Sequence, residues 1–301
     1  MTRLKSFLIA LNNERKIFLN KAILDKVYND ELAYENCLSN IADRICRDGD
    51  IKLLLITGGS CAGKTTTTRK LSELITERGR PTYTVSLDDY YRNLDESVYL
   101  PDGTRDIESI NSLRIDLVRE AMSSLLAGKE TPIPMFDFKI KKRIDDYRRI
   151  TLRDNDVVII EGLHALSPAL FESVPDERAL YRVYLYADAC DGSDCRFVRR
   201  LVRDSRHRNA SAERTYELWD NVKKNERVSI EPYRKYADVT INTFFPYERY
   251  ILDDDAVRLL ESVAPESRHY DSARRLIGLL DISEQWGDEV IPENSLLREF
   301  I

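Results

Sequence analysis

The chain has 301 residues, enough for one large α/β domain or two small ones. Apolar residues make up 43% of it, so a full hydrophobic core can be buried, and the formal net charge of -6 argues against a general nucleic-acid-binding surface. No apolar run approaches the ~20 residues of a membrane span, and no signal-peptide cleavage site follows the N-terminal apolar patch. The five cysteines form no CxxC pair, so we expect reduced thiols and a cytoplasmic protein.

The N-terminal segment 1–49 is predicted to be helical. Its first apolar run places Leu4, Phe7 and Leu8 on one helical face, and a second run ends at the Asp-Gly-Asp sequence of 48–50. We expect this segment to be an extension that precedes the main domain.

Buried strands and helices are predicted to alternate along the rest of the chain. Apolar segments favour strands at 51–57, 82–87, 156–162, 181–187 and 237–242, and the two prolines of 132–138 require an extended segment. Helices are expected at about 65–78, 109–127, 193–206 and 211–228, and in most of the C-terminal region. This alternation predicts a three-layer α/β/α fold with a mostly parallel central sheet.

A glycine-rich stretch follows the first expected strand. Gly58, four further residues and then Gly63-Lys64-Thr65 fit the pattern G-x-x-x-x-G-K-[ST]. Such a loop turns backbone N–H groups toward phosphate, the following helix adds its positive end, the lysine contacts β- and γ-phosphates, and the hydroxyl can bind Mg²⁺. The residues predicted to hold ATP and Mg²⁺ here are Gly58, Gly59, Ser60, Cys61, Ala62, Gly63, Lys64, Thr65 and Thr66.

Carboxylates follow two of the expected strands, where α/β sheets bind ligands. Glu161 ends the strand at 156–162 and could hold the Mg²⁺ hydration shell, unless it is a turn or capping carboxylate. Asp88 and Asp89 follow the strand at 82–87. A carboxylate beside the γ-phosphate could take a proton from an attacking hydroxyl, and a solvated loop pair is the alternative.

Positive charge for a transferring phosphoryl group is available in an arginine-rich helix. Arg196, Arg199, Arg200 and Arg203 recur at i, i+3, i+4 and i+7, with apolar residues on the other face. We expect this helix to dock by its apolar side, with the arginines facing a cleft or solvent and Arg208 beyond them. A solvated basic face is the alternative. A guanine-reading N-K-x-D motif after the loop and an ABC-type signature are both absent, which favours a small-molecule kinase.

Several motifs together resemble the uridine kinase / phosphoribulokinase family of P-loop kinases. They are GGSCAGKTT, VSLDDYYR, IPMFDF, VVIIEGLHAL, RRLVRDSRHR and RKYADVTIN, in that order over roughly 51–243. The resemblance implies a P-loop NTPase fold with a helical lid, and ATP-dependent phosphorylation of a sugar hydroxyl, typically the 5′-hydroxyl of uridine or cytidine. We divide the chain into a helical extension at 1–49, a kinase domain at 50–245 and a helical C-terminal extension at 246–301 that packs on the kinase domain.

The resemblance also implies roles for single residues. Asp88 matches the general base, and Glu108 falls where the family has an Asp that holds the ribose hydroxyls. Phe136 stands where nucleoside-specific members have Tyr. The residues expected to contact the acceptor are Asp88, Tyr91, Glu108, Phe136, Phe138 and Lys141. The residues expected to neutralise the phosphates are Lys64, Arg199, Arg203 and Arg208, of which the last three match the lid region.

Lys141 departs from the family pattern. Nucleoside-specific members have a His there to read the pyrimidine edge, whereas a Lys is only a donor and carries a charge. Lys139, Lys141, Lys142 and Arg143 could together bind a sugar phosphate, or the segment KIKKR could be a solvated turn between two extended segments.

The predictions of a nucleoside acceptor and of catalysis therefore both have alternatives. The chain could phosphorylate a non-nucleoside sugar, a sugar phosphate or a polyol, or it could be a nucleotide-binding regulatory protein without catalysis. The expected partner is a small-molecule acceptor, with no nucleic acid and no membrane, and a homo-oligomer is a candidate assembly. His164 is expected to make a structural hydrogen bond rather than bind a metal, and Cys61 to be a tolerated small residue rather than a redox switch.

Overall fold

A computed structural model describes residues 21–99, 103, 105–106, 108–172, 174–189, 194–280 and 284–301. The chain forms two compact units. The first takes its described residues from Met1–Cys37, Ala187–Trp219 and Asn242–Ile301, and the second from Leu38–Tyr186 and Asp220–Ile241. The helix expected around Leu4, Phe7 and Leu8 lies outside the described residues. The three-part division of the chain stays a prediction.

A five-stranded sheet in the order β2-β5-β1-β6-β7 organises the second unit. Its strands are β1 (Leu53–Gly58), β2 (Thr82–Ser86), β5 (Val157–Glu161), β6 (Leu180–Tyr186) and β7 (Val239–Asn242). β1 pairs in parallel with both β5 and β6, and β2 pairs in parallel with β5. Every residue of β1 is buried, as expected of a parallel strand covered on both faces.

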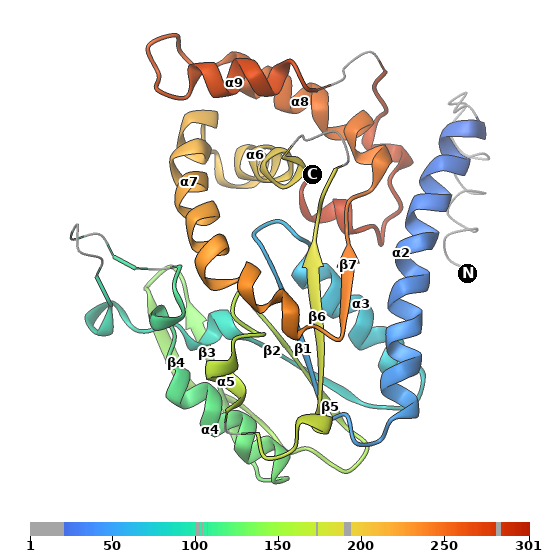
Figure 1. Ribbon diagram of the computed structural model, residues 1–301, viewed down its shortest axis with the longest axis vertical. Coiled ribbons are helices and arrows are strands. Elements are labelled where there is room, and N and C mark those ends of the chain that lie inside the picture. The colour runs from blue at the N-terminus through green and yellow to red at the C-terminus, as the bar shows by residue number, and fades with distance from the viewer. Residues whose placement is uncertain are drawn as a thin grey trace. The chain divides into compact units, whose positions relative to one another are not determined.

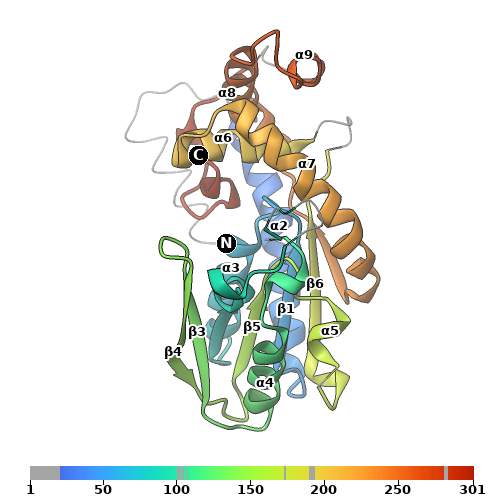
Figure 2. The same ribbon diagram turned by 90° about the vertical axis from the view of Figure 1, so that its left-hand side faces the viewer.

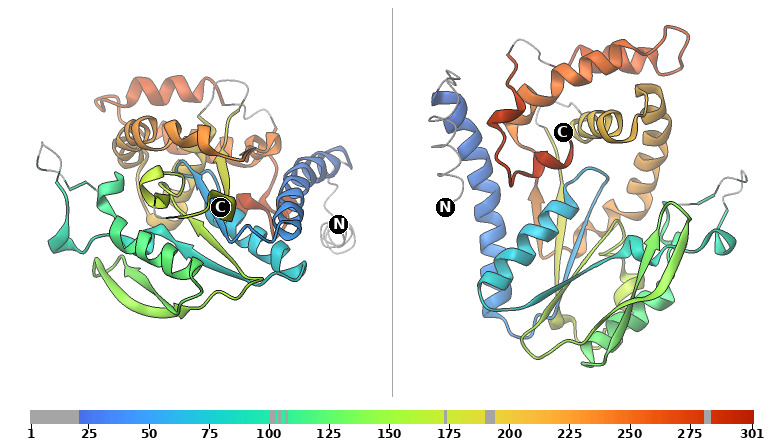
Figure 3. Two further views of the ribbon diagram at one scale, coloured as in Figure 1. Left: turned by 60° about the horizontal axis from the view of Figure 1, so that its bottom comes forward. Right: turned by 180° about the vertical axis from the view of Figure 1, so that it is seen from behind.

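Helices cover the two faces of this sheet. Helix α3 (Lys64–Glu77) packs against β1, β2 and β5, while α4 (Ile115–Leu126) packs against α5 (Pro168–Phe171). Figures 1 and 3 show α3 and α5 on opposite faces, which confirms the predicted three-layer α/β architecture. Alternate residues of the strands, such as Leu53 and Leu55, enter the apolar core shared with α4 and α5.

Helix α4 begins later than predicted. Residues 109–127 were expected to be helical, but a 3-10 turn at Ile110–Ser112 precedes the helix, and Leu113 forms an isolated β-bridge with Tyr91. The Ser109 hydroxyl accepts the N–H of Asn111 and so stabilises the turn. The bridge requires an extended backbone at Leu113, which excludes a continuous helix.

An antiparallel hairpin forms a second sheet in this unit. It consists of β3 (Thr131–Asp137) and β4 (Lys142–Ile150), which appear beside each other in Figure 2. The extended segment predicted from its prolines is confirmed as β3. β4 was not predicted, because most of its side chains are exposed and charged and so give no apolar signal.

The end of helix α2 (Lys21–Arg47) is held within the second unit by a buried arginine. Arg80 Nη1 donates to the carbonyls of Ile45 at 2.6 Å and Asp48 at 3.0 Å, and Nη2 donates to Ile51 at 2.8 Å. A helix leaves its last carbonyls without helical partners, and the guanidinium supplies donors to this part of the chain. Residues 38–49 of the expected N-terminal extension are therefore a structural part of the sheet-containing unit.

The first unit is helical. Its helices are the first part of α2, α6 (Cys195–Arg208), the first part of α7 (Ala212–Ser229), α8 (Arg249–Glu261) and α9 (Tyr270–Ile277). After residue 284 the chain forms only short 3-10 turns rather than the expected longer helix, yet Ile291, Leu296 and Phe300 are completely buried. Among the described residues, no helix has both the length and the apolar character needed to cross a membrane.

Gly58 is predicted to tolerate no side chain. A Cβ there would lie 2.5 Å from the Leu185 carbonyl oxygen, and the two residues are partners in the β1–β6 pairing. We expect Gly58→Ala to lower the free energy of unfolding by about 1–3 kcal/mol, because neither backbone can move easily. Gly49→Ala is the control, since no atom lies within 4 Å of its added Cβ. Equal denaturant midpoints for the two variants would contradict the prediction.

Candidate active site

The phosphate loop joins β1 to α3 through a left-handed turn. Cys61 and Gly63 have φ angles of 61° and 79°. Gly63 is the N-cap of α3 and makes no side-chain cap, so the positive end of the helix follows the loop directly. Lys64 Nζ folds back to donate to the carbonyls of Gly58 at 3.0 Å and Gly59 at 3.1 Å. A cation and a helix N-terminus thus meet at one loop, as phosphate binding requires.

Side-chain oxygens from three elements line one cavity beside this loop. The cavity has a volume of about 490 Å³, and its walls include Thr65 of α3 and the strand-end residues Ser86 and Glu161. Ser86 Oγ donates to Glu161 Oε1 at 2.6 Å, and the two residues face each other in the β2–β5 register. A hydroxyl and a carboxylate suit Mg²⁺, which usually takes few protein ligands and completes its shell with phosphate and water.

The described residues contain no group of three or more His, Cys, Asp or Glu side chains that could hold a metal. A Mg²⁺ ion at Thr65 and Glu161 would therefore depend on nucleotide phosphates and water for its other ligands. Sequence reasoning missed Ser86, because only the β2–β5 register places this strand-end residue opposite Glu161.

Asp88 lies in a 3-10 turn directly after β2, close to charges of both signs. Its N–H donates to Ser86 Oγ at 3.3 Å. The residue as a whole is exposed to solvent, but protein atoms pack closely around its carboxyl group. The resulting loss of hydration raises its pKa to about 6, with further raising by the charge of Glu161 and partial compensation by Lys64. A carboxyl group in this range can accept a proton near neutral pH.

The second aspartate of the pair has a different task. Asp89 Oδ1 accepts the N–H of Phe136 at 3.1 Å, and this hydrogen bond connects the turn after β2 to strand β3. Three rings gather there, with centroid distances of 5.8 Å for Tyr91–Phe136, 6.1 Å for Tyr91–Phe138 and 4.9 Å for Phe136–Phe138. Phe138 remains 60% exposed while Phe136 is buried. The cluster therefore offers ring surface to a flat apolar ligand.

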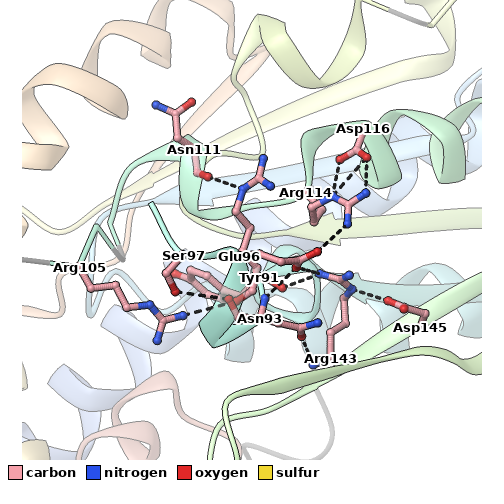
Figure 4. A network of polar contacts seen from close by, with 11 residues as sticks. Tyr91, Asn93, Glu96, Ser97, Arg105, Asn111, Arg114, Asp116, Arg143 and Asp145 are labelled. Atoms are coloured by element: carbon pink, nitrogen blue, oxygen red, sulfur yellow. Dashed lines mark hydrogen bonds and ion pairs between the residues drawn. The ribbon is translucent and has the colours of Figure 1, made fainter. Parts of the chain in front are cut away.

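Arg143 is held by protein groups around Tyr91 in a network of polar contacts (Figure 4). Its side chain is 3% exposed, and it forms ion pairs with Asp145 and Glu96. Nη1 donates to the Tyr91 carbonyl at 2.8 Å, while its backbone N–H donates to Asn93 Oδ1 at 2.8 Å. The suggestion that Arg143 binds a sugar phosphate is thus wrong for this structure, because its guanidinium is buried and engaged.

The three lysines considered with Arg143 lie around the β3–β4 turn and are exposed. Asp137 Oδ1 accepts the N–H groups of Lys139 at 2.8 Å and Ile140 at 3.3 Å, and Lys141 has a φ of 53°. This geometry fits the solvated-turn alternative for KIKKR. Contact between Lys141 and an acceptor stays a prediction.

Glu108 is held through its backbone. Its carbonyl accepts His164 Nε2 at 2.9 Å and Asn225 Nδ2 at 2.8 Å. Burial lowers the pKa of His164, so the neutral ring donates from Nε2. The structural hydrogen bond expected of His164 is confirmed. Asn225 and its neighbour Glu226, which accepts the Ser60 N–H at 2.8 Å, were not predicted because no motif spacing marks them.

The arginines of α6 belong to the first unit, and two of them are buried. Arg199 is fully buried, with Nη2 at 2.6 Å from both Glu248 Oε2 and the Thr243 carbonyl, and its guanidinium lies over the Phe300 ring. The expectation that all four arginines face a cleft or solvent is wrong for Arg199 and Arg200. The helical periodicity was right, but a buried carboxylate attracts arginine as strongly as a phosphate does.

Arg203 and Arg208 converge on one buried carboxylate. Arg203 Nη2 lies 3.5 Å from Asp204 Oδ1, and Arg208 Nη1 lies 3.1 Å from the same atom. Arg200 Nε donates to Asp204 Oδ2 at 3.2 Å. The Arg208 side chain is 57% exposed, in contrast to Arg199. Phosphate contacts of Arg203 and Arg208 stay predictions.

Comparison with known proteins gives a family match over most of the chain. The model of the phosphoribulokinase / uridine kinase family matches residues 53–246. A uridine kinase of Halobacterium salinarum is 30% identical over 187 residues, which cover 62% of this chain and 77% of the relative. A uridine kinase of Deinococcus deserti is 30% identical over 187 residues, covering 62% of this chain and 84% of the relative. The family match includes the phosphate loop, the Asp88 turn and Glu161.

Removal of the Arg199 guanidinium should destabilise the fold. Glu248 is 2% exposed, and Arg199→Ala leaves its carboxylate buried without this cation. We expect a loss of about 3–5 kcal/mol in the free energy of unfolding, measured with denaturant. Arg214→Ala is the control, since its partner Glu217 is a surface residue, and should change stability by less than about 1 kcal/mol. Unchanged stability of Arg199→Ala would contradict the structural role.

The titration of Asp88 should be displaced toward neutral pH. Because its pKa is raised to about 6, its ionised fraction falls as the pH drops through about 6 rather than through the usual range near 4. Carboxyl NMR of the nucleotide-free protein, assigned with Asp88→Asn, measures the midpoint. Glu161→Gln removes one raising charge and should lower the midpoint. A wild-type midpoint near 4 would show that the surrounding protein does not raise the pKa of this carboxyl group.

Proposed function

The chain belongs to the phosphoribulokinase / uridine kinase family, and on this premise we propose that it transfers the γ-phosphate of ATP to the 5′-hydroxyl of a nucleoside such as uridine or cytidine. One observation carries the proposal. The Lys64 charge lowers the pKa of Asp88, and the Asp88 charge raises that of Tyr91. The phosphate loop, the Asp88 carboxyl group and the Tyr91 ring therefore lie close enough to one another for their charges to interact.

The proposed reaction uses positioning and charge neutralisation. The phosphate loop binds the β- and γ-phosphates, and Lys64 neutralises charge that develops between them. Mg²⁺ held by Thr65 and Glu161 would supply further charge neutralisation when bound with the nucleotide. Asp88 accepts the hydroxyl proton while the acceptor oxygen bonds to the γ-phosphorus and the bond from phosphorus to the β–γ bridging oxygen breaks. The products are the phosphate ester and ADP, with the proton on Asp88.

The aromatic cluster favours a nucleoside among the acceptors. A flat base can pack on the exposed Phe138 ring and on Tyr91, and Glu108 provides a carboxylate for the ribose hydroxyls. A sugar phosphate would instead need a cation beside Asp88 that is available to the ligand, whereas Arg143 is already bonded to the Tyr91 carbonyl and Asp145. A cytoplasmic setting, a homo-oligomeric assembly and independence of nucleic acid belong to the same proposal.

A nucleoside panel with ATP tests the proposal. We expect uridine or cytidine to be phosphorylated, and Asp88→Asn to lower kcat by about 10²-fold or more, since a general base contributes that much. Lys64→Ala should also fall toward background, whereas Asp95→Asn, an exposed control, should not. Turnover of a sugar or polyol that uridine does not inhibit would favour the non-nucleoside alternative. Absence of phosphorylation with every nucleoside and sugar would refute a kinase.

A further inference from the structure

Two consecutive residues of helix α7 contact two different loops of the second unit. Glu226 Oε1 accepts the Ser60 N–H at 2.8 Å, and Asn225 Nδ2 donates to the Glu108 carbonyl at 2.8 Å. Ser60 belongs to the phosphate loop, and Glu108 belongs to the segment expected to contact the acceptor. All four residues lie within the same unit. A short piece of one helix therefore connects the donor side of the site with its acceptor side.

The Glu226 contact is unusual in its charge. Glu226 is only 3% exposed, and it lies against a loop that is proposed to bind anionic phosphate. A carboxylate repels a nearby phosphate by Coulomb's law, so Glu226 does not contribute to phosphate binding through its charge. Ser60 directly precedes Cys61, whose φ of 61° is strained for a residue with a Cβ. A charge-assisted hydrogen bond at Ser60 can hold the backbone at the entrance to this strained turn.

The Asn225 contact fixes the other loop. The Glu108 carbonyl receives two donors, Asn225 Nδ2 and His164 Nε2, from two separate segments that both follow it in sequence. His164 comes three residues after Glu161, so the same carbonyl is also tied to the end of β5. Only a donor side chain can make the Asn225 contact, because a carbonyl oxygen is purely an acceptor.

We propose that Asn225 and Glu226 are positioning residues that hold the phosphate loop and the segment around Glu108 at a fixed separation. Phosphoryl transfer needs the attacking oxygen and the phosphorus about 3–3.5 Å apart, and a displacement of about 1 Å can cost about 10²-fold in rate. The Glu226 half depends only on the phosphate loop. The Asn225 half rests on the proposed acceptor role of Glu108.

Direct ATP binding by calorimetry tests Glu226 without any acceptor. Glu226→Ala should weaken ATP binding about tenfold, because the loop loses the acceptor for its Ser60 N–H. Glu226→Gln keeps a carbonyl oxygen and should bind ATP within about twofold of wild type. Glu217→Ala, an exposed truncation on the same helix, is the matched control. Thermal unfolding of each variant reports whether it is folded.

Two results would overturn the role of Glu226. Equal or tighter ATP binding by Glu226→Ala would mean that the carboxylate competes with phosphate instead of shaping the loop. Equal weakening by Gln and Ala would mean that the retained oxygen does not position the loop. If the Ala variant fails to fold, the Gln variant decides: affinity within about twofold of wild type supports the proposal, and a tenfold loss overturns it.

Steady-state kinetics test Asn225 separately. Asn225→Asp keeps the shape but loses the donor, so KM for the acceptor should rise about five- to tenfold while ATP affinity stays unchanged. Asn221→Asp, exposed one turn earlier on α7, is the control. An unchanged acceptor KM, or an equal loss of ATP affinity, would overturn this half. Failure of wild type to phosphorylate nucleosides refutes the proposed acceptor alone: the ATP-binding experiment still decides Glu226, and any other alcohol that is turned over serves for Asn225.

Discussion

The parallel register of β1, β2 and β5 is the constraint on which the candidate site depends. In this register Ser86 of β2 and Ile56 of β1 both lie opposite Glu161 of β5. Parallel strands end at the same edge of a sheet, so the segments that follow them must begin side by side. The phosphate loop, the Asp88 turn and the Glu161 carboxylate therefore meet, although more than 70 residues of chain separate Asp88 from Glu161 (161 − 88 = 73).

Charges of both signs are concentrated at this edge, and most of them have a defined partner. Lys64 donates to two loop carbonyls, Glu161 accepts the Ser86 hydroxyl, and Asp88 is left as the carboxyl with a pKa raised into the neutral range. Glu226 adds a buried carboxylate whose partner is a backbone N–H of the loop. Hydrogen bonds to protein groups therefore fix the positions of Glu161 and Glu226 beside the phosphate loop.

The arginines of α6 show the limit of inference from helical spacing. Their i, i+3, i+4 pattern predicts one face, and that face does exist, but periodicity does not identify what it contacts. Arg199 pairs with Glu248, which lies 49 residues away in sequence, and Arg200, Arg203 and Arg208 turn toward Asp204. Strand β4 was missed because its side chains are mostly exposed and charged, so its sequence has no apolar alternation. Only its pairing with β3 shows that it is a strand.

The sequence by itself determined the parts of the protein whose physics is local. A buried strand, a glycine turn and a helix follow one another within residues 53–77, and so the phosphate loop and the layered α/β fold could be predicted. Tertiary structure decided which partners meet across long separations: Ser86 with Glu161, Glu226 with Ser60, Asn225 with Glu108, and Arg199 with Glu248. Hydrogen bonds and ion pairs are short-ranged and directional, so a contact between distant residues is specified only when the packed elements bring both groups within about 3 Å.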